Sequence, residues 1–147
     1  LTVVNAVGSI HEPSTGEIIA GPRSPDGTPR ASVEIYADHN FGKQTEGSSP
    51  LGNTTIGLVA TNLKLTKAQA NRLATVAHDG LALAIRPTHT LHDGDTMFAV
   101  ATGDIDAPDE FMRLCALTPN LVARSIVSAI DHARELHGFP ARRQRDA

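Results

Sequence analysis

The residues best suited to do chemistry in this sequence are hydroxyl, carboxyl and carboxamide side chains at the edges of apolar segments. Gly52-Asn53-Thr54-Thr55 stands where a proline- and glycine-rich stretch meets an apolar run. Asp93-Gly94-Asp95 comes directly before a second apolar run, and Asn5 interrupts a third. A hydroxyl nucleophile, acidic groups and an amide donor are groups that hydrolyse amide bonds in enzymes.

A threonine that follows a glycine and a carboxamide residue suits cleavage of the backbone. The Thr54 hydroxyl can attack the Asn53 carbonyl carbon and form an ester that water opens, which leaves Thr54 with a free α-amine. Because an α-amine has a reference pKa of about 7.7–8.0, part of it is neutral near pH 7 and can accept the proton of its own hydroxyl. The Asn53–Thr54 bond is therefore a candidate cleavage site, and Thr54 is a candidate amino-terminal nucleophile.

The two aspartates stand two positions apart before a predicted strand, so their side chains can point to the same side. One of Asp93 and Asp95 could hold the Thr54 ammonium or hydroxyl group while the other orients the first, and close carboxylates raise each other's pKa. The Asn5 amide could donate to a developing oxyanion. Each pattern also has a structural interpretation: a strand-forming threonine, a turn capped by aspartate, and a strand asparagine bonded to neighbouring backbone.

Two alternatives to this hydrolase remain open. The segment His89-x-x-His92-Asp93-x-Asp95 offers four ligating side chains, and histidine with two carboxylates would suit several divalent ions. A helical register for these ligands is not expected so soon after Pro87. The chain could then be a divalent-metal-binding module, or it could be an uncleaved, non-catalytic paralogue kept for assembly.

Apolar runs and turn residues predict the amino-terminal elements. Strands are expected at residues 2–7, ended by Gly8, and at residues 17–20, and the turn-forming residues between them favour a hairpin. Residues 21–53 are interrupted by proline and glycine, so they predict a long loop in which only residues 31–37 could be regular. Such a loop suits a cleavable linker.

The rest of the chain alternates between strand and helix patterns. Residues 54–61 have too few polar positions for a half-exposed strand and predict one that is covered on both faces. A capping-box pattern at Thr66 and Gln69 opens a predicted helix. The expected order is a strand, a helix, a loop, a strand closed by Gly103, and two helical stretches, the second beginning at Pro119: residues 54–61, 67–85, 88–95, 96–102, 108–117 and 119–138. This alternation predicts an α/β layered domain.

Composition limits the classes of function. The chain has one cysteine, which excludes an internal disulfide and a multi-cysteine zinc site. Its net charge of −3 and its 3% aromatic content argue against nucleic acid or an anionic membrane as partner. No apolar stretch approaches the roughly 18 residues that span a bilayer, so a soluble, cytoplasmic protein is expected. The chain starts at Leu1 inside an apolar run, and we expect it to be a fragment or a processed product.

Six segments in order resemble the L-aminopeptidase, D-amidase/D-esterase family, which includes the β-peptidyl aminopeptidases and the nylon-oligomer hydrolase. They are residues 3–8, 52–61, 65–70, 77–82, 85–87 and 92–99. The resemblance implies a precursor that cuts itself between Asn53 and Thr54. Because this sequence has threonine where many relatives have serine, it is closest in type to the nylon-oligomer hydrolase. Asp93 and Asp95 fall on the family's acidic or polar pair, and Asn5 falls on its active-site asparagine.

The resemblance also implies an architecture and partners. The family fold is a layered α-β-β-α sandwich of the N-terminal-nucleophile-hydrolase type. Residues 1–53 would be the carboxy-terminal end of the larger chain with its linker, and residues 54–147 the smaller chain, together forming part of one domain. The amino-terminal portion of the precursor would supply a further Tyr or Lys and the walls of the substrate pocket. Relatives assemble as homo-oligomers of cleaved heterodimers, and a small peptide or amide would be hydrolysed without metal or cofactor.

Overall fold

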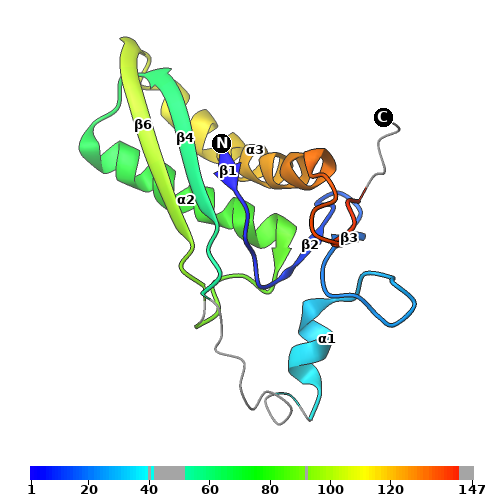
Figure 1. Cartoon of the computed structure of the whole chain (residues 1–147). Coiled ribbons are helices and arrows are strands. Elements are labelled where there is room, and N and C mark those ends of the chain that lie inside the picture. Colours follow the sequence, from blue (N-terminus) through cyan, green and yellow to red (C-terminus); the bar gives the residue numbers. More distant parts are fainter. Residues whose placement is uncertain (40, 42–51, 92, 143–147) are drawn as a thin grey trace.

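The computed structural model describes residues 1–39, 41, 52–91 and 93–142, which form a mixed α/β fold (Figure 1). The larger sheet has the strand order β1 (Thr2–Val3), β4 (Ile56–Leu63) and β6 (Thr96–Ile105). β1 is antiparallel to β4, whereas β4 and β6 are parallel. Because parallel strands start at the same edge of a sheet, the residues just before β4 and β6 are neighbours in space.

The parallel pair is connected through α2 (Lys67–Ala84), which runs behind β4 and β6 in Figure 1. The capping box is present: the Thr66 hydroxyl accepts from the Gln69 backbone N–H, and the Gln69 side chain accepts from the Thr66 backbone N–H. The buried face of α2 recurs every three or four residues: Leu73, Val76, Ala77, Gly80, Leu81 and Ala84. The predicted helix is therefore confirmed.

The two helical stretches predicted around Pro119 are one helix, α3 (Glu110–His132), so the predicted break is wrong. Proline inside a helix removes a hydrogen bond, but the buried face of α3 continues across it through Thr118, Val122 and Ile126. The burial of this face of α3 against α2 thus stabilises the helix by more than Pro119 destabilises it. The helix also ends at His132 rather than at Gly138, which lies in a turn bounded by Leu136 and Phe139.

The amino-terminal strand prediction needs correction as well. Residues 2–7 are not one strand: β1 ends at Val3, and the chain passes Gly8 to form β2 (Ser9–His11). A Cβ atom on Gly8 would lie 2.0 Å from the Pro87 carbonyl oxygen, so this close backbone approach requires glycine. β2 pairs antiparallel with both β3 (Ile18–Ala20) and β5 (Ile85–Arg86). The hairpin therefore joins β2 to β3.

The predicted linker contains one regular element among its described residues, α1 (Ser32–Ala37), as expected. Residues 40 and 42–51 lie outside the described residues.

The end of β6 also differs from the prediction, because Gly103 does not close this strand. It adopts a left-handed φ of 83° where the β4–β6 register shifts, and β6 continues to Ile105.

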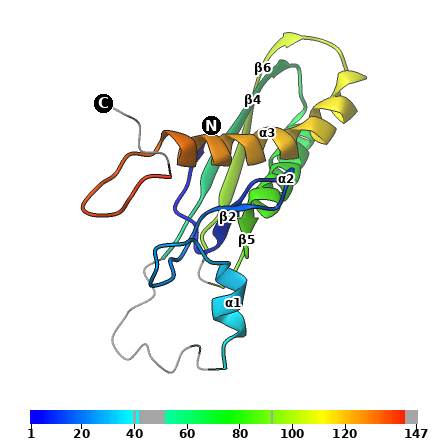
Figure 2. The same cartoon turned by 90° about the vertical axis from the view of Figure 1, so that its right-hand side faces the viewer.

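The prediction that residues 54–61 form a strand covered on both faces is wrong for the described residues. Along β4, Gly57 and Val59 are buried whereas Ile56 and Leu58 are exposed. α2 and α3 pack on each other beside the sheet (Figure 2), and the opposite face of β4 and β6 is open. The core lies between the helices and the sheets and consists of Ile10, Ile19, Val59, Leu73, Val76, Ala77, Leu81, Ala84, Ile85, Met97, Val122, Ala123 and Ile126.

None of the helices in the described ranges is long and apolar enough to cross a membrane.

Candidate active site

The Asn53–Thr54 peptide lies at the edge of the sheet where β4 begins. Asn53 forms an isolated parallel bridge with Asp93, three residues before the first β4–β6 pair and in the same register. The Thr54 backbone N–H donates to the Asn5 carbonyl oxygen at 2.9 Å. Three segments that are far apart in the sequence, at Asn5, Asn53 and Asp93, therefore meet at one peptide bond.

The carbonyl oxygen of Asn53 has two donors. The Thr54 hydroxyl donates to it at 2.7 Å, and the backbone N–H of Gly94 donates at 2.9 Å. Donors at about 2.7–3.1 Å are the geometry that stabilises an oxyanion formed from a carbonyl oxygen. Gly94 also lies against the hydroxyl, since a Cβ atom built on it would be 2.7 Å from Thr54 Oγ1.

Asp95 is held beneath this peptide with only 4% of its side chain exposed. Its Oδ1 accepts from the backbone N–H of Thr55 at 2.9 Å. Its Oδ2 accepts from the Thr88 hydroxyl at 2.9 Å and lies 3.2 Å from His89 Nδ1. In the uncut chain Asp95 thus reaches Thr54 through the backbone of the next residue, and its direct contact with the Thr54 ammonium or hydroxyl stays a prediction.

Asp93 has a different environment from Asp95. Its Oδ2 accepts from the backbone N–H of Thr90 at 2.8 Å, and its own N–H donates to the Thr90 carbonyl oxygen at 3.1 Å. These bonds link Thr90 to Asp93, the residue before Gly94, which is the capping role that aspartate has in turns. The two carboxylates therefore serve separate partners here, and a catalytic role for Asp93 stays a prediction.

Asn5 lies next to the Asn53–Thr54 peptide, and its backbone makes a shorter contact there than its side chain does. Its carbonyl oxygen accepts from the Thr54 N–H, while its side-chain Oδ1 lies 3.4 Å from Asn53 Nδ2. Asn5 is exposed, and its side-chain amide is seen in contact with the Asn53 side chain rather than with the Asn53 carbonyl oxygen. Its role as an oxyanion donor stays a prediction.

Two histidines accompany Asp95. His89 has a left-handed φ of 56°, which is uncommon for a residue other than glycine, and its ring centroid lies 5.0 Å from that of His78 on α2. Burial lowers the pKa of His78, and the nearby His89 lowers it further, whereas Asp95 and Asp79 oppose the shift. His78 is therefore expected to be neutral at pH 7.

The sequence analysis missed three contributors to this cluster. The Gly94 N–H and the Asn5 carbonyl are backbone groups, so the type of residue does not indicate that they contribute. His89 was considered only as a metal ligand, although its position six residues before Asp95 and just after a strand was a signal of proximity. Within the described ranges, no three His, Cys, Asp or Glu side chains are grouped to hold a metal ion. His92 lies outside those ranges.

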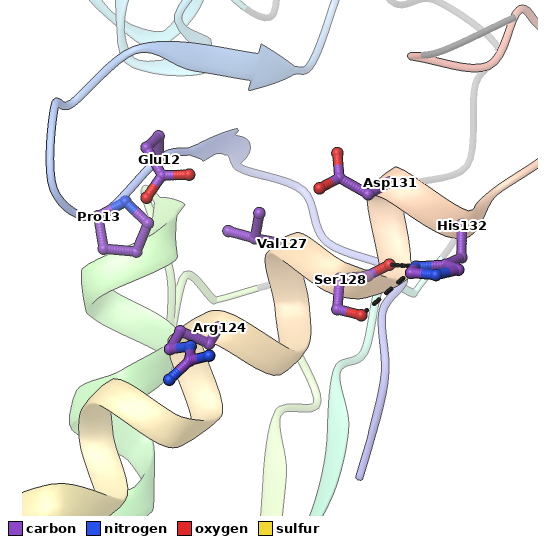
Figure 3. A pocket seen from close by; sticks show the side chains of 7 residues that line it. All are labelled: Glu12, Pro13, Arg124, Val127, Ser128, Asp131 and His132. Atoms are coloured by element: carbon purple, nitrogen blue, oxygen red, sulfur yellow. Dashed lines mark hydrogen bonds between the residues drawn. The ribbon is translucent and has the colours of Figure 1, made fainter.

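Two surface pockets are lined by other parts of the chain. One, of about 270 Å³, lies between the 12–13 turn and the last turns of α3 and includes Glu12, Arg124 and Asp131 (Figure 3). The other, of about 190 Å³, lies between β3 and residues 130–142. Thr54 and the described residues of the loop before β6 line neither of these two pockets, and the candidate site is identified by its hydrogen-bond geometry.

Comparison with known proteins gives a consistent result. An "uncharacterized aminopeptidase" of Mycobacterium tuberculosis (strain ATCC 25618 / H37Rv) is 35% identical over 97% of this chain and 46% of its own length. A protein of the same description from Mycobacterium leprae is 34% identical over 95% of this chain and 42% of its own. A 6-aminohexanoate-oligomer endohydrolase of Paenarthrobacter ureafaciens is 35% identical over 74% of this chain and 30% of its own.

This chain spans less than half the length of these curated relatives. The family model described as peptidase family S58 matches residues 7–144, which is nearly all of the chain. The chain belongs to peptidase family S58.

Proposed function

We propose that this chain is part of a hydrolase that cuts itself between Asn53 and Thr54 and then hydrolyses amide or peptide bonds with Thr54 as its nucleophile. The observation that carries the proposal is the environment of the Asn53 carbonyl oxygen. That oxygen accepts from the Thr54 hydroxyl at 2.7 Å and from the Gly94 N–H at 2.9 Å. The nucleophile and the oxyanion donor are thus both next to the bond to be cut.

Cleavage would follow from these contacts. Thr54 Oγ1 attacks the Asn53 carbonyl carbon, and the Gly94 N–H stabilises the negative charge that develops on the carbonyl oxygen. The carbon–nitrogen bond then breaks, and the proton lost by the hydroxyl is found on the departing Thr54 nitrogen. Water hydrolyses the resulting ester, which gives an Asn53 carboxylate, a free Thr54 hydroxyl and a free Thr54 α-amine.

The same groups would then act on substrate. The Thr54 α-amine accepts the proton of its own hydroxyl, and the hydroxyl attacks the amide carbon of the substrate. The Asn5 carbonyl oxygen, which accepts from the Thr54 nitrogen at 2.9 Å in the uncut chain, would orient this amine. The substrate amine leaves, and water releases the acyl group from Thr54. No metal or organic cofactor takes part.

Substrate class, architecture and assembly form part of the proposal. Because relatives are named aminopeptidase or 6-aminohexanoate-oligomer endohydrolase, we expect a small peptide, amide or amide oligomer as substrate. Residues 1–53 would end the larger chain and residues 54–147 would form the smaller one. The open face of β4 and β6 would pack on a second sheet from the preceding portion, giving an α-β-β-α sandwich. The cleaved heterodimers would form a homo-oligomer in the cytoplasm.

Intact-mass analysis of the full-length protein tests this function. Wild-type protein is expected to give two polypeptides, one beginning at Thr54, and to hydrolyse a dipeptide or 6-aminohexanoate oligomer. Thr54→Ala is expected to give one uncut chain without activity, and Thr54→Ser, which keeps a hydroxyl, to cut and to hydrolyse. Cutting in the alanine variant, or activity from an uncut wild-type chain, would remove Thr54 from its role.

A further inference from the structure

The strongest unexplained feature outside the groups that would cut the chain is the surroundings of the Asp95 carboxylate. Its Oδ1 accepts from the Thr55 N–H at 2.9 Å, so the carboxylate is one residue away from the nucleophile. Its Oδ2 accepts from the Thr88 hydroxyl at 2.9 Å and faces His89 Nδ1 at 3.2 Å. One hydrogen bond is thus made to each oxygen of this carboxylate, which is 4% exposed, and His89 Nδ1 is a further polar group beside Oδ2.

We propose that His89 is a positioning residue of the Thr54 site: its Nδ1–H holds Asp95, and Asp95 holds the backbone immediately after Thr54. The inference rests on the proposed function, because it concerns the same nucleophile. It adds a residue and a role to that function. His89 would touch neither the substrate nor the scissile bond.

The backbone of His89 supports this assignment. Its φ of 56° is a conformation that favours glycine, asparagine and aspartate, yet a histidine occupies it. A left-handed residue persists when its surroundings hold it, and such residues gather at functional sites. Here the surroundings are Asp95 and the ring of His78, which lies 5.0 Å away at 54°.

The charges around His89 are compatible with the role. Asp95 faces it directly, and His78 packs against it from α2. Burial holds the pKa of His78 below its usual range, with His89 as the second cause, while Asp95 and Asp79 act in the opposite direction. A neutral His78 places no positive charge beside the His89–Asp95 contact, so that contact is not opposed from the helix.

A matched pair of substitutions separates the hydrogen bond from the backbone. His89→Asn and His89→Asp have side chains of nearly equal size, and both tolerate a left-handed φ. The asparagine NH₂ can replace Nδ1–H as a donor to Asp95, whereas the aspartate can only place a second carboxylate against it. In the full-length protein, His89→Asn is expected to cut at Asn53–Thr54 near the wild-type rate. His89→Asp is expected to cut roughly tenfold to hundredfold more slowly.

His137 provides the control. It has a left-handed φ of 51° in the turn after α3 and is not part of the cluster at Asp95. His137→Asn and His137→Asp should therefore cut at equal rates. If His89→Asn and His89→Asp also cut at equal rates, whether both fast or both slow, the donor role is overturned. Should His89→Asp not fold, His89→Gly suits the same backbone without a donor and takes its place in the comparison.

A second measurement does not depend on cutting. In full-length protein that also carries Thr54→Ala, hydrogen exchange of the Thr55 amide reports its bond to Asp95 Oδ1. His89→Asp is expected to speed this exchange by roughly tenfold or more relative to His89→Asn, as for an amide that loses its bond. Equal exchange overturns the positioning role even if Thr54 cuts as proposed. Unequal exchange in a protein that never cuts would support the positioning and refute the proposed function.

Discussion

At the scale of single residues, the candidate site is a set of hydrogen bonds around the carbonyl group of Asn53. The Thr54 hydroxyl and the Gly94 N–H converge on the Asn53 oxygen, and the Asn5 carbonyl holds the nitrogen of the same peptide. One side of the peptide bond is thus prepared to accept negative charge, and the other is prepared to leave as an amine. The contacts come from three separate segments, so an error in any one of them should slow cleavage.

Replacing Gly94 tests the oxyanion donor. Gly94→Ala would put a Cβ atom 2.7 Å from Thr54 Oγ1, so either the hydroxyl or the loop must move. We expect cleavage to slow by about a hundredfold, the cost of a displacement near 1 Å at a reacting group. The rate is followed by intact mass after rapid purification. Gly52→Ala is the control, because a Cβ atom there meets no heavy atom within 4 Å; cleavage that stays equally fast in both variants would contradict the role of Gly94.

Asp95→Asn tests whether the buried negative charge matters. The amide keeps the size of the carboxylate, and its oxygen can still accept from the Thr55 N–H, so the fold should survive. Without the charge, we expect turnover to fall by roughly a hundredfold with little change in KM, because the loss affects the reacting groups rather than substrate binding. Steady-state kinetics on an amide substrate measure this. A wild-type kcat would return Asp95 to a purely structural role.

The sequence predicts Asn5, Asn53, Thr54, Asp93 and Asp95 as site residues, and the fold brings them near one peptide, while their roles stay predictions. Side chains with reactive groups leave a signal in a sequence. The Gly94 N–H and the Asn5 carbonyl leave none, because every residue but proline carries both backbone groups and only their positions matter here.

At the scale of elements, local sequence signals predict an element correctly where no contact with a distant part of the chain opposes them. The capping box and the apolar stripe predict α2, and both are present. The prediction failed at Pro119 and Gly8, where contacts distant in sequence decide. Burial of α3 against α2 carries the helix through Pro119, and the Pro87 carbonyl oxygen beside Gly8 fixes a bend between β1 and β2. A sequence read segment by segment contains neither contact.

The contact between α2 and α3 gives a stability prediction. A Cβ atom on Gly80 would lie 2.5 Å from the Pro119 carbonyl oxygen and 2.6 Å from Val122 Cβ. Gly80→Ala gains about 1 kcal/mol of helix propensity, but overpacking of this contact costs about 1–3 kcal/mol. We expect a net loss of roughly 1 kcal/mol, measured by urea unfolding of the full-length protein. Asn71→Ala, at an exposed position of α2, should be neutral or stabilising; a stabilising Gly80→Ala would show that the helices can separate at no cost.

At the scale of the whole molecule, the sheet has one covered and one open face. Outward-pointing residues of β1, β4 and β6 include Val3 at 65% exposure and Phe98 at 55%. An apolar strand pattern at residues 54–61 therefore does not mean that this chain itself covers both faces. An apolar pattern indicates that the strand is buried in the folded protein, whichever segment covers it. This chain spans less than half the length of the curated relatives that it matches. Sequence pattern and structure are reconciled if the second face is covered by the preceding portion.

The open face supplies the test of that architecture. If a second sheet covers β4 and β6 in the full-length protein, Phe98→Asp loses about 1.5–3 kcal/mol of side-chain burial and also places a charge in an apolar layer. We expect its thermal midpoint to fall by several degrees and part of the protein to aggregate, as followed by calorimetry and light scattering. Met112→Asp, at an apolar position of α3 that is 80% exposed, makes the same chemical change elsewhere and should lower the midpoint little. If both variants melt like the wild type, the face of β4 and β6 stays in solvent and the layered sandwich is wrong.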